Sequence, residues 1–245
     1  MKLTTISTMS PKELDKAQTE KETKALLEQI VEYQQVFYAE KKHSLLIVFQ
    51  GMDTSGKDNV IKKVFSGLNP LGCRAVGFKA PTEEEYAHDF LWRIHQHTPP
   101  KGIIQLFDRS HYEDVLVPRV EGWIDHEAVK RRLEHINNFE RLLQDSGTTI
   151  LKFYLHISKE KQKERLEERK TNPKKMWKND PNDSKVSAEW DAYMKAYEDV
   201  FEHCNTIPWT IVPSDHRWYK DYIVAKATCN AMEAMKLSYP SGYIG

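Results

Sequence analysis

Two glycines and a lysine between Gly51 and Lys57 have the types and spacing of a loop that could cradle an anion. The stretch reads Gly-Met-Asp-Thr-Ser-Gly-Lys, which is the spacing of a phosphate-binding P-loop. The glycines let the backbone turn tightly, so that successive N–H groups point into one concavity, and the following helix adds its positive dipole end. We therefore expect phosphate groups to be bound by Gly51, Thr54, Ser55, Gly56 and Lys57.

Two aspartates depart from the usual composition of such a loop. Asp58 stands where a P-loop normally has the Ser or Thr that ligates Mg²⁺, and Asp53 lies where phosphate oxygens would approach. A carboxylate would repel phosphate there unless a cation lay between them, and Mg²⁺ is commonly held by one or two carboxylates plus substrate phosphates. The pattern predicts a metal-bridged site. The alternative is a chance turn in which Asp58 only favours a helix start.

A second acidic segment follows an apolar run and reads Asp108-Arg109-Ser110-His111-Tyr112-Glu113-Asp114. A carboxylate directly after a buried strand is the Walker B arrangement, which holds Mg²⁺ or its waters. Arg109 could clamp phosphate oxygens with two hydrogen bonds, and Glu113 could orient an incoming phosphate acceptor. In the alternative interpretation Asp108 only forms a turn. His111 by itself is better explained as a packed side chain.

A basic segment follows the fourth predicted strand. Arg165 and Arg169 lie one helical turn apart and share a face. No acidic residue interrupts the lysines that follow, which are Lys170, Lys174, Lys175 and Lys178. A charged helix is usually a solvated face, but this one leads into a stretch broken by prolines and asparagines. We expect residues 158–187 to form a helical lid that closes over a polyanion and excludes water.

Strands and helices alternate along the chain, which predicts a three-layer α/β/α sandwich with a mostly parallel five-stranded sheet. Apolar runs predict strands at 45–49, 73–79, 103–107, 149–157 and 209–212. Helical patterns cover 11–43, with Ser10 as the expected N-cap, the segment after the P-loop, and 83–96, 125–144, 158–169, 188–203 and 218–235. Ligands of such sheets bind at the carboxyl ends of the strands, so the acidic and basic clusters should meet on one edge.

Composition limits the function classes. The 245 residues fit one large domain, divided into a helical extension (1–43) with a frayed start (1–10), a core (44–236) and a tail (237–245). The 36 basic and 36 acidic residues balance, so net charge does not indicate a nucleic-acid partner. No apolar run approaches the length of a membrane span or signal core, and we expect a cytoplasmic protein. We expect Cys73, Cys204 and Cys229 to be core residues rather than disulfides or metal ligands.

Three segments together resemble the polyphosphate kinase 2 family over about residues 20–236: the Asp-containing P-loop, Lys79-Ala80-Pro81-Thr82 and the segment from Asp108 to Asp114. The resemblance implies a thymidylate-kinase-like core that moves phosphate between inorganic polyphosphate and nucleotides with Mg²⁺, or Mn²⁺ as the alternative ion. Asp53 and Asp108 would then hold the metal. The catalytic groups that grip phosphate would be Lys57, Arg109, Arg165 and Arg169, supported in phosphate binding by Asp58, Lys170, Lys174 and Lys175.

The resemblance also implies the acceptor and the partners. The nucleotide site would comprise Lys79, Pro81, Thr82, Arg93, Glu113 and Arg119. Members that mainly phosphorylate nucleoside diphosphates tend to have Asn where Glu113 stands. Glu113 makes the chain resemble class III, which accepts AMP as well as ADP. The expected ligands are polyphosphate, AMP, ADP and ATP, with guanine nucleotides as further candidates and without nucleic acid or membrane. The long leading helix is compatible with a homo-oligomer, either a dimer or a tetramer.

Two other readings of the residues stay open. An ATP-dependent nucleoside monophosphate kinase would use the same sheet, loop and lid, with ATP as the donor in the P-loop; Asp53 and Asp58 argue against it. A noncatalytic polyphosphate- or nucleotide-binding module would not need metal carboxylates such as Asp108.

Overall fold

The computed structural model describes residues 2–178 and 186–242, and its centre is a five-stranded sheet in which each strand runs parallel to its neighbours. The strand order is β2-β3-β1-β4-β5. The strands are β1 Ser44–Gln50, β2 Cys73–Gly77, β3 Ile104–Asp108, β4 Thr148–His156 and β5 Trp209–Pro213. The predicted sandwich is confirmed, and the sheet is fully parallel.

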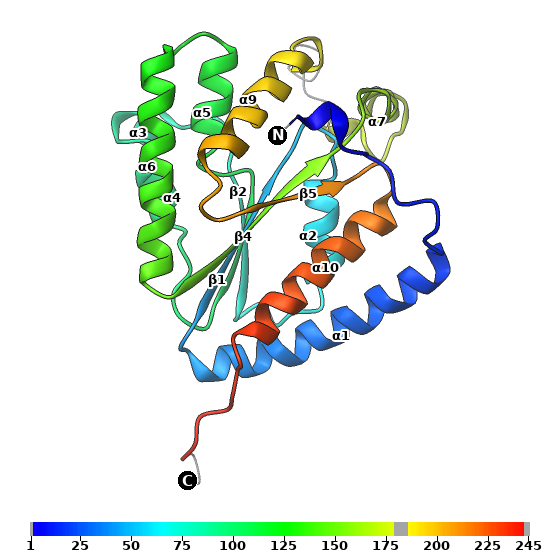
Figure 1. Cartoon of the computed structure of the whole chain (residues 1–245), viewed down its shortest axis with the longest axis vertical. Helices are drawn as coiled ribbons and strands as arrows, with labels where there is room; N and C mark the ends of the chain where they lie inside the picture. Colours follow the sequence, from blue (N-terminus) through cyan, green and yellow to red (C-terminus); the bar gives the residue numbers. More distant parts are fainter. Residues whose placement is uncertain (1, 179–185, 243–245) are drawn as a thin grey trace.

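Helices cover both faces of the sheet because alternate residues of the central strand β1 point into two separate cores. Leu46 and Val48 pack on one side, and Leu45 and Ile47 pack on the other. The first core is closed by α5 (Glu113–Val120), α6 (His126–Asp145) and α9 (Trp190–His203). The second is closed by α1 (Lys16–Glu40), α2 (Lys57–Phe65) and α10 (Arg217–Ala234), and α1 lies along α10 (Figure 1).

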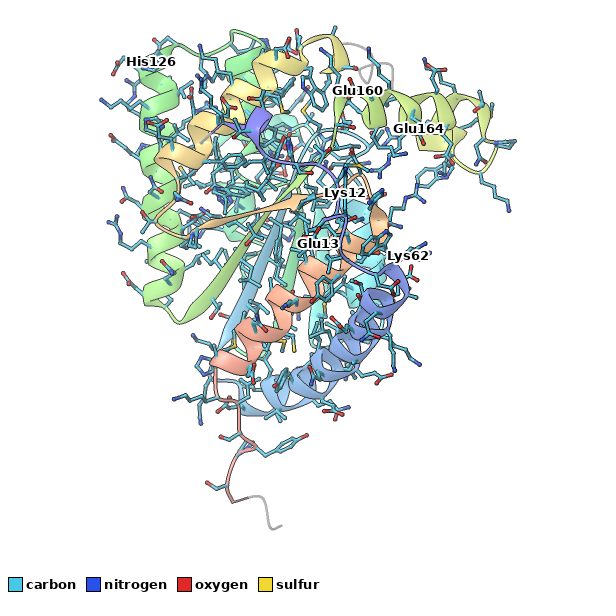
Figure 2. All side chains as sticks on the ribbon, turned by 45° about the vertical axis from the view of Figure 1, so that its right-hand side comes forward. Lys12, Glu13, Lys62, His126, Glu160 and Glu164 are labelled. Carbon is cyan, nitrogen blue, oxygen red and sulfur yellow. The ribbon has the colours of Figure 1, made fainter. Side chains whose placement is uncertain are left out.

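The predicted lid helix is present as α7 (Lys159–Thr171), followed by the short helix η2 (Met176–Lys178). Figure 2 shows α7 projecting from the body of the molecule, with Glu160 and Glu164 labelled along it and His126 on the opposite side. Ser158 is the N-cap of α7 and accepts a hydrogen bond from the Lys161 N–H at 3.1 Å. The predicted lid extends to residue 187, and its part from 179 to 185 lies outside the described residues.

The expectation of a frayed start is wrong for the residues that the structure describes. Leu3, in the short helix η1 (Leu3–Thr5), is only 1% exposed and packs into the first core. Its N–H donates to Glu198 Oε1 of α9 at 2.7 Å. Thr8 Oγ1 donates to Asp215 Oδ2 at 2.8 Å. The first segment of the chain is therefore held across the carboxyl ends of β4 and β5 (Figure 1).

Two predicted helix boundaries are also wrong, each because a side chain forms a hydrogen bond that competes with the predicted helix. Helix α1 begins at Lys16 rather than Pro11, since the Ser10 hydroxyl pairs with His216 Nδ1 at 2.9 Å and Asp15 is the N-cap. The predicted helix over 83–96 is two short helices, α3 (Glu83–Ala87) and α4 (Trp92–His95). Between them, Asp89 Oδ1 accepts the Leu91 N–H at 2.9 Å in a local turn that competes with the helix.

The helix α5 had no counterpart in the predicted pattern. It begins inside the acidic segment, at Glu113, and it contains Pro118, a residue that argues against a helix in sequence. The three cysteines are free thiols; Cys204 and Cys229 are buried, as expected, whereas Cys73 is half-buried. Within the described residues, no helix combines the length and apolar character needed to cross a bilayer.

Candidate active site

The P-loop and the acidic segment meet because β1 and β3 are neighbours in register. Phe49 of β1 pairs with Asp108 of β3, and the Arg109 N–H donates to the Phe49 carbonyl at 3.0 Å. The polar segments that follow the two strands therefore begin at the same level on the carboxyl edge of the sheet. Arg109 has a φ of 64°, a left-handed conformation that is uncommon outside glycine and that turns its side chain toward the loop.

The first glycine of the P-loop is required by close packing as well as by its conformation. Gly51 has a φ of 147°, and a Cβ there would lie 2.7 Å from the Leu155 carbonyl oxygen of β4. No side chain fits at that distance without moving the strand. The loop then ends at Gly56, with a φ of 98°, as the N-cap of α2. The predicted strand–loop–helix arrangement is confirmed.

Lys57 is buried inside this loop. Its Nζ donates to the Gly51 carbonyl at 2.8 Å and lies 3.4 Å from the Met52 carbonyl. Burial, and then the positive charge of Arg109, lower the pKa of Lys57 against the opposing effect of nearby carboxylates. An anion bound in the loop would favour the charged form of this amine.

Asp53 and Arg109 form an ion pair at the mouth of the loop, with Asp53 Oδ1 2.6 Å from Arg109 Nη2. Arg109 Nη1 also lies 3.7 Å from Glu113 Oε2, at the first turn of α5. Burial opposes ionisation of Asp53, but Arg109, Lys57 and Arg169 outweigh it, so the pKa of Asp53 lies below its ordinary value. The charge of Asp53 therefore balances several cations at once.

Asp108 interacts with the carboxyl group of Asp58. Burial, and then a hydrogen bond with the Asp58 carboxyl, raise the pKa of Asp108 to about 6. Two carboxyl groups that face each other in this way share a proton, or they share a cation that replaces it. The donor set fits a divalent cation held by two carboxylates and completed by substrate phosphates. No group of three or more ligating side chains occurs in the described parts of the chain.

Arg165 of the lid helix binds the P-loop from outside it. One Nη donates to the carbonyls of Thr54 and Ser55 at 2.9 and 3.4 Å, and the other donates to those of Ser214 and Asp215 at 2.9 and 3.0 Å. The guanidinium thus joins the loop to the segment after β5. Arg169, one turn further along α7, contributes its charge to Asp53.

Two lysines at and just beyond the end of the lid helix pair with glutamates of that helix. Lys170 Nζ lies 2.6 Å from Glu167 Oε1, and Lys175 Nζ lies 2.5 Å from Glu168 Oε1. Exposed pairs of this kind contribute little to stability. A polyanion could therefore replace the glutamates as the partner of these lysines with a small loss of free energy. Lys174 is exposed beside them.

The residues predicted for the nucleotide do not all gather at one place. Arg93 is buried and donates to the Lys79 carbonyl at 2.9 Å and to Asp114 Oδ2 at 3.0 Å, so it supports the turn that carries Lys79. Thr82 forms a capping box with Glu85 at the start of α3, and Pro81, directly before Thr82, is half-buried. Arg119 of α5 instead pairs with Asp199 of α9.

A buried polar network supports the acidic segment from below. Lys152 of β4 donates to Glu140 Oε2 at 2.8 Å and to the Tyr112 hydroxyl at 2.9 Å. Glu140 Oε1 accepts the Tyr112 hydroxyl at 2.7 Å and lies 3.3 Å from His111 Nε2. His111 is thus a packed residue, as expected. The network fixes His111 and Tyr112, the last two residues before Glu113.

Sequence patterns missed Gln50, Gln162 and Lys220 as residues of the site. In the amide orientation that satisfies its neighbours, Gln50 donates to Glu113 Oε1 at 2.9 Å. Gln162 Nε2 lies 3.4 Å from the Asp53 carbonyl, and Lys220 Nζ donates to the Gly56 carbonyl at 3.1 Å. Gln50 was detectable, because it ends the strand that leads into the loop. The other two come from helices distant in sequence, and no motif marks them.

Comparisons with known proteins agree with this geometry. The family model described as polyphosphate kinase 2 matches residues 13–240. The AMP/ADP-polyphosphate phosphotransferase of Meiothermus ruber is 46% identical over 209 residues, which are 84% of this chain and 78% of the relative. The ADP-polyphosphate phosphotransferase of Rhodopseudomonas palustris is 40% identical over 228 residues, 87% of this chain and 79% of that protein.

A solved structure is similar over the whole chain. The crystal structure of polyphosphate kinase 2 from Arthrobacter aurescens TC1 superimposes with a TM-score of 0.96 at 38% identity, and the match covers 100% of this chain and 89% of that one.

Proposed function

The chain belongs to the polyphosphate kinase 2 family, and we propose that it transfers phosphate between inorganic polyphosphate and adenine nucleotides, converting AMP to ADP and ADP to ATP reversibly. The catalytic unit is the core over residues 44–236, including the lid over 158–187, with 1–43 as an extension and 237–245 as a tail. The observation that carries the proposal is the convergence of an acidic P-loop with the Asp108 segment on one edge of the sheet.

The chain's own residues supply charge neutralisation and alignment. A phosphoanhydride donor already stores the energy of the bond that is transferred, so the enzyme must bring donor and acceptor into line and neutralise their charges. Lys57, Arg109 and Arg169 surround the mouth of the loop with positive charge, where the transferring phosphate would lie. The lid lysines Lys170, Lys174 and Lys175 extend this charge along the donor chain.

A divalent cation fits the carboxyl pair of Asp58 and Asp108. We propose Mg²⁺, with Mn²⁺ as the alternative, held by Asp108 with Asp58 and with Asp53 close by. When bound, the ion neutralises charge that develops on the transferring phosphate. Asp53 keeps its ion pair with Arg109 and fixes the orientation of that guanidinium. This assigns to Asp58 a metal role that the sequence interpretation gave to Asp53.

The acceptor nucleotide is assigned to the side of the site where Glu113 and the Lys79 turn lie. Glu113 is held by Gln50 and faces Arg109, so it is placed to orient the acceptor phosphate. The Lys79 turn, with Pro81 and Thr82, is rigidified by Arg93. The relative from Meiothermus ruber, which carries both AMP and ADP in its name, supports a class III acceptor range.

The wider assignments are proposals of the same kind. We propose adenine nucleotides before guanine nucleotides as acceptors, no nucleic-acid partner, and a homo-oligomer of two or four chains. An ATP-dependent nucleoside monophosphate kinase is not favoured, because Asp58 replaces the hydroxyl that would ligate Mg²⁺ beside ATP.

The test is a nucleotide assay with Mg²⁺ and long-chain polyphosphate, in which AMP and ADP are offered separately and ATP is left out. The expected result is that ADP yields ATP, and that AMP yields first ADP and then ATP. ATP from ADP alone would keep the polyphosphate activity and contradict the acceptor range. A parallel assay offers AMP with ATP and without polyphosphate. ADP formed there, with no product from polyphosphate, would overturn the proposal.

A further inference from the structure

Every backbone carbonyl of the P-loop from Gly51 to Gly56 has a side-chain partner. Lys57 donates to the carbonyls of Gly51 and Met52. On the lid helix α7, Gln162 donates to the carbonyl of Asp53, and Arg165 donates to those of Thr54 and Ser55. Lys220 of α10 donates to the last carbonyl, that of Gly56. Carbonyl oxygens repel phosphate, so a loop that binds phosphate must keep all of them turned away from it.

Lys220 acts at the peptide that joins the loop to the helix α2. Its Nζ lies 3.1 Å from the Gly56 carbonyl and 3.2 Å from Asn59 Oδ1, on the first turn of α2. In a planar trans peptide the C=O of Gly56 and the N–H of Lys57 point in opposite directions, and cis peptides are absent from the described residues. By holding the carbonyl, Lys220 sets the direction of the first N–H of the helix.

A cation at this place is costly unless it has a function. Lys220 is 1% exposed, and its nearest carboxylate, Asp221 of the same helix, lies 3.4 Å away. A methionine would fill much of the same volume without the desolvation of an ammonium group. The carbonyl of Gly56 also accepts the Val60 N–H within α2, so it would keep one hydrogen bond without Lys220. Local structure alone therefore does not require the lysine.

We propose that Lys220 is a positioning residue for the donor, which holds the Gly56 peptide and adds a positive charge behind the P-loop, so that the loop binds the phosphates of a polyphosphate chain. This rests on the proposed function. Lys220 does not touch the donor: it acts through the Gly56–Lys57 peptide, and the field of its charge reaches the anion through the loop.

The charges around Lys220 are consistent with that role. Burial comes first in lowering the pKa of Lys220 to about 8; Asp221 opposes the shift, and Arg165 of α7 and Arg217 of α10 add to it. Without an anion the amine is attracted by the Asp221 carboxylate and repelled by the guanidinium groups of Arg165 and Arg217. A bound polyanion would relieve this repulsion among Lys220, Arg165 and Arg217.

The test measures binding of inorganic tripolyphosphate by isothermal titration calorimetry, in excess Mg²⁺, to the full chain and to Lys220→Met. The variant should bind the probe at least about tenfold more weakly, as expected when a charged hydrogen bond is lost. In the assay its KM for polyphosphate should rise by a similar factor, with the KM for AMP changed less than about twofold. Lys226→Met, an exposed lysine on the same helix, is the matched control.

Asn59→Ala is the second variant in case Lys220→Met does not fold, as judged by circular dichroism and Tm. Asn59 is exposed, and its loss frees Lys220 Nζ from one partner, so the tripolyphosphate Kd should rise about two- to fivefold. An unchanged Kd in the folded variant overturns the inference, as does an equal loss in kcat, both KM values and Tm, which would indicate a structural role. A wild-type chain that neither binds tripolyphosphate nor uses polyphosphate overturns the proposed function as well.

Discussion

Arg109 Nη2 lies 2.6 Å from Asp53 Oδ1, across the mouth of the P-loop. The two residues come from the ends of β3 and β1, and the left-handed backbone at Arg109, with a φ of 64°, allows the contact. The pair places an acidic residue inside a phosphate loop without leaving its charge uncompensated. Substrate would find the guanidinium already oriented, which lowers the entropy lost when it binds phosphate.

Replacing Asp53 by Ala should therefore reduce kcat by two or more orders of magnitude, roughly the loss seen when one pre-oriented charge is removed from a site. Steady-state kinetics with polyphosphate and ADP measure the effect, and circular dichroism checks the fold. Asp145→Ala, at an exposed position at the end of α6, should leave kcat unchanged. Activity of Asp53→Ala within a few-fold of wild type would contradict the role.

The carboxyl pair makes a separate prediction about metal. Asp58→Asn and Asp108→Asn should each raise the Mg²⁺ concentration needed for half-maximal activity by about tenfold or more, because each removes one of two charged ligands. The measurement is a Mg²⁺ titration at fixed polyphosphate. If Asp58→Asn titrates like the wild type while Asp108→Asn does not, Asp58 is not a ligand.

Arg169 should matter for the donor more than for the acceptor. Arg169→Ala is expected to raise the KM for polyphosphate by about tenfold, because a charge-assisted contact is lost. The KM for AMP should change little. Arg141→Ala, exposed on α6, serves as the matched control. An unchanged kcat/KM for polyphosphate would remove Arg169 from the lid's binding surface.

The buried network makes a prediction about stability. Lys152 and Glu140 are 1% and 2% exposed. Lys152→Met leaves the Glu140 carboxylate without its cation and should lower the free energy of unfolding by about 3–5 kcal/mol. The double variant Lys152→Met, Glu140→Leu should recover part of that loss. Urea denaturation measures both, with the exposed Glu134→Gln as control; a double variant less stable than the single one would contradict the coupling.

The binding of a polyanion should be accompanied by proton uptake at the Lys220 amine. Its pKa of about 8 lies below the ordinary 10.5, and a nearby anion raises it again, so binding at pH 8 takes up protons and weakens as pH rises further. Calorimetry in two buffers with different ionisation enthalpies gives the number of protons. The pKa of Lys57 is lowered too, so Lys57 can also take up protons when the anion binds. Lys220→Met should therefore take up fewer protons than the wild type; equal uptake would contradict this prediction.

The parts of the site that sequence predicts are those formed by neighbours in the chain. The glycine and lysine spacing, and an aspartate after a buried strand, are local patterns, and the alternation of strands and helices places them on one edge. The side chains from other helices that bind the loop carbonyls follow no local pattern. Lys220 is 164 positions away from Gly56, and no spacing rule connects them.

The boundaries that sequence missed have the same cause. Ser10 has the side chain of an N-cap, but its hydroxyl binds His216, 206 positions away, so the helix begins later. Pro118 argues against a helix, yet α5 forms around it because Val115 and Leu116 pack into the first core. In both places tertiary contacts outweigh a local preference, which is about 1 kcal/mol for an N-cap and about 3 kcal/mol for a proline inside a helix.

The strand order also determines when the sheet can begin to form during synthesis. β1 and β2 are the first two strands to be made, but β3 lies between them in the sheet. A nascent chain therefore has no pair of neighbouring strands until Ile104–Asp108 has left the ribosome. β1, although the earliest strand, keeps one edge unpaired until β4 follows. Its apolar side chains therefore stay exposed during that interval, when aggregation competes with folding.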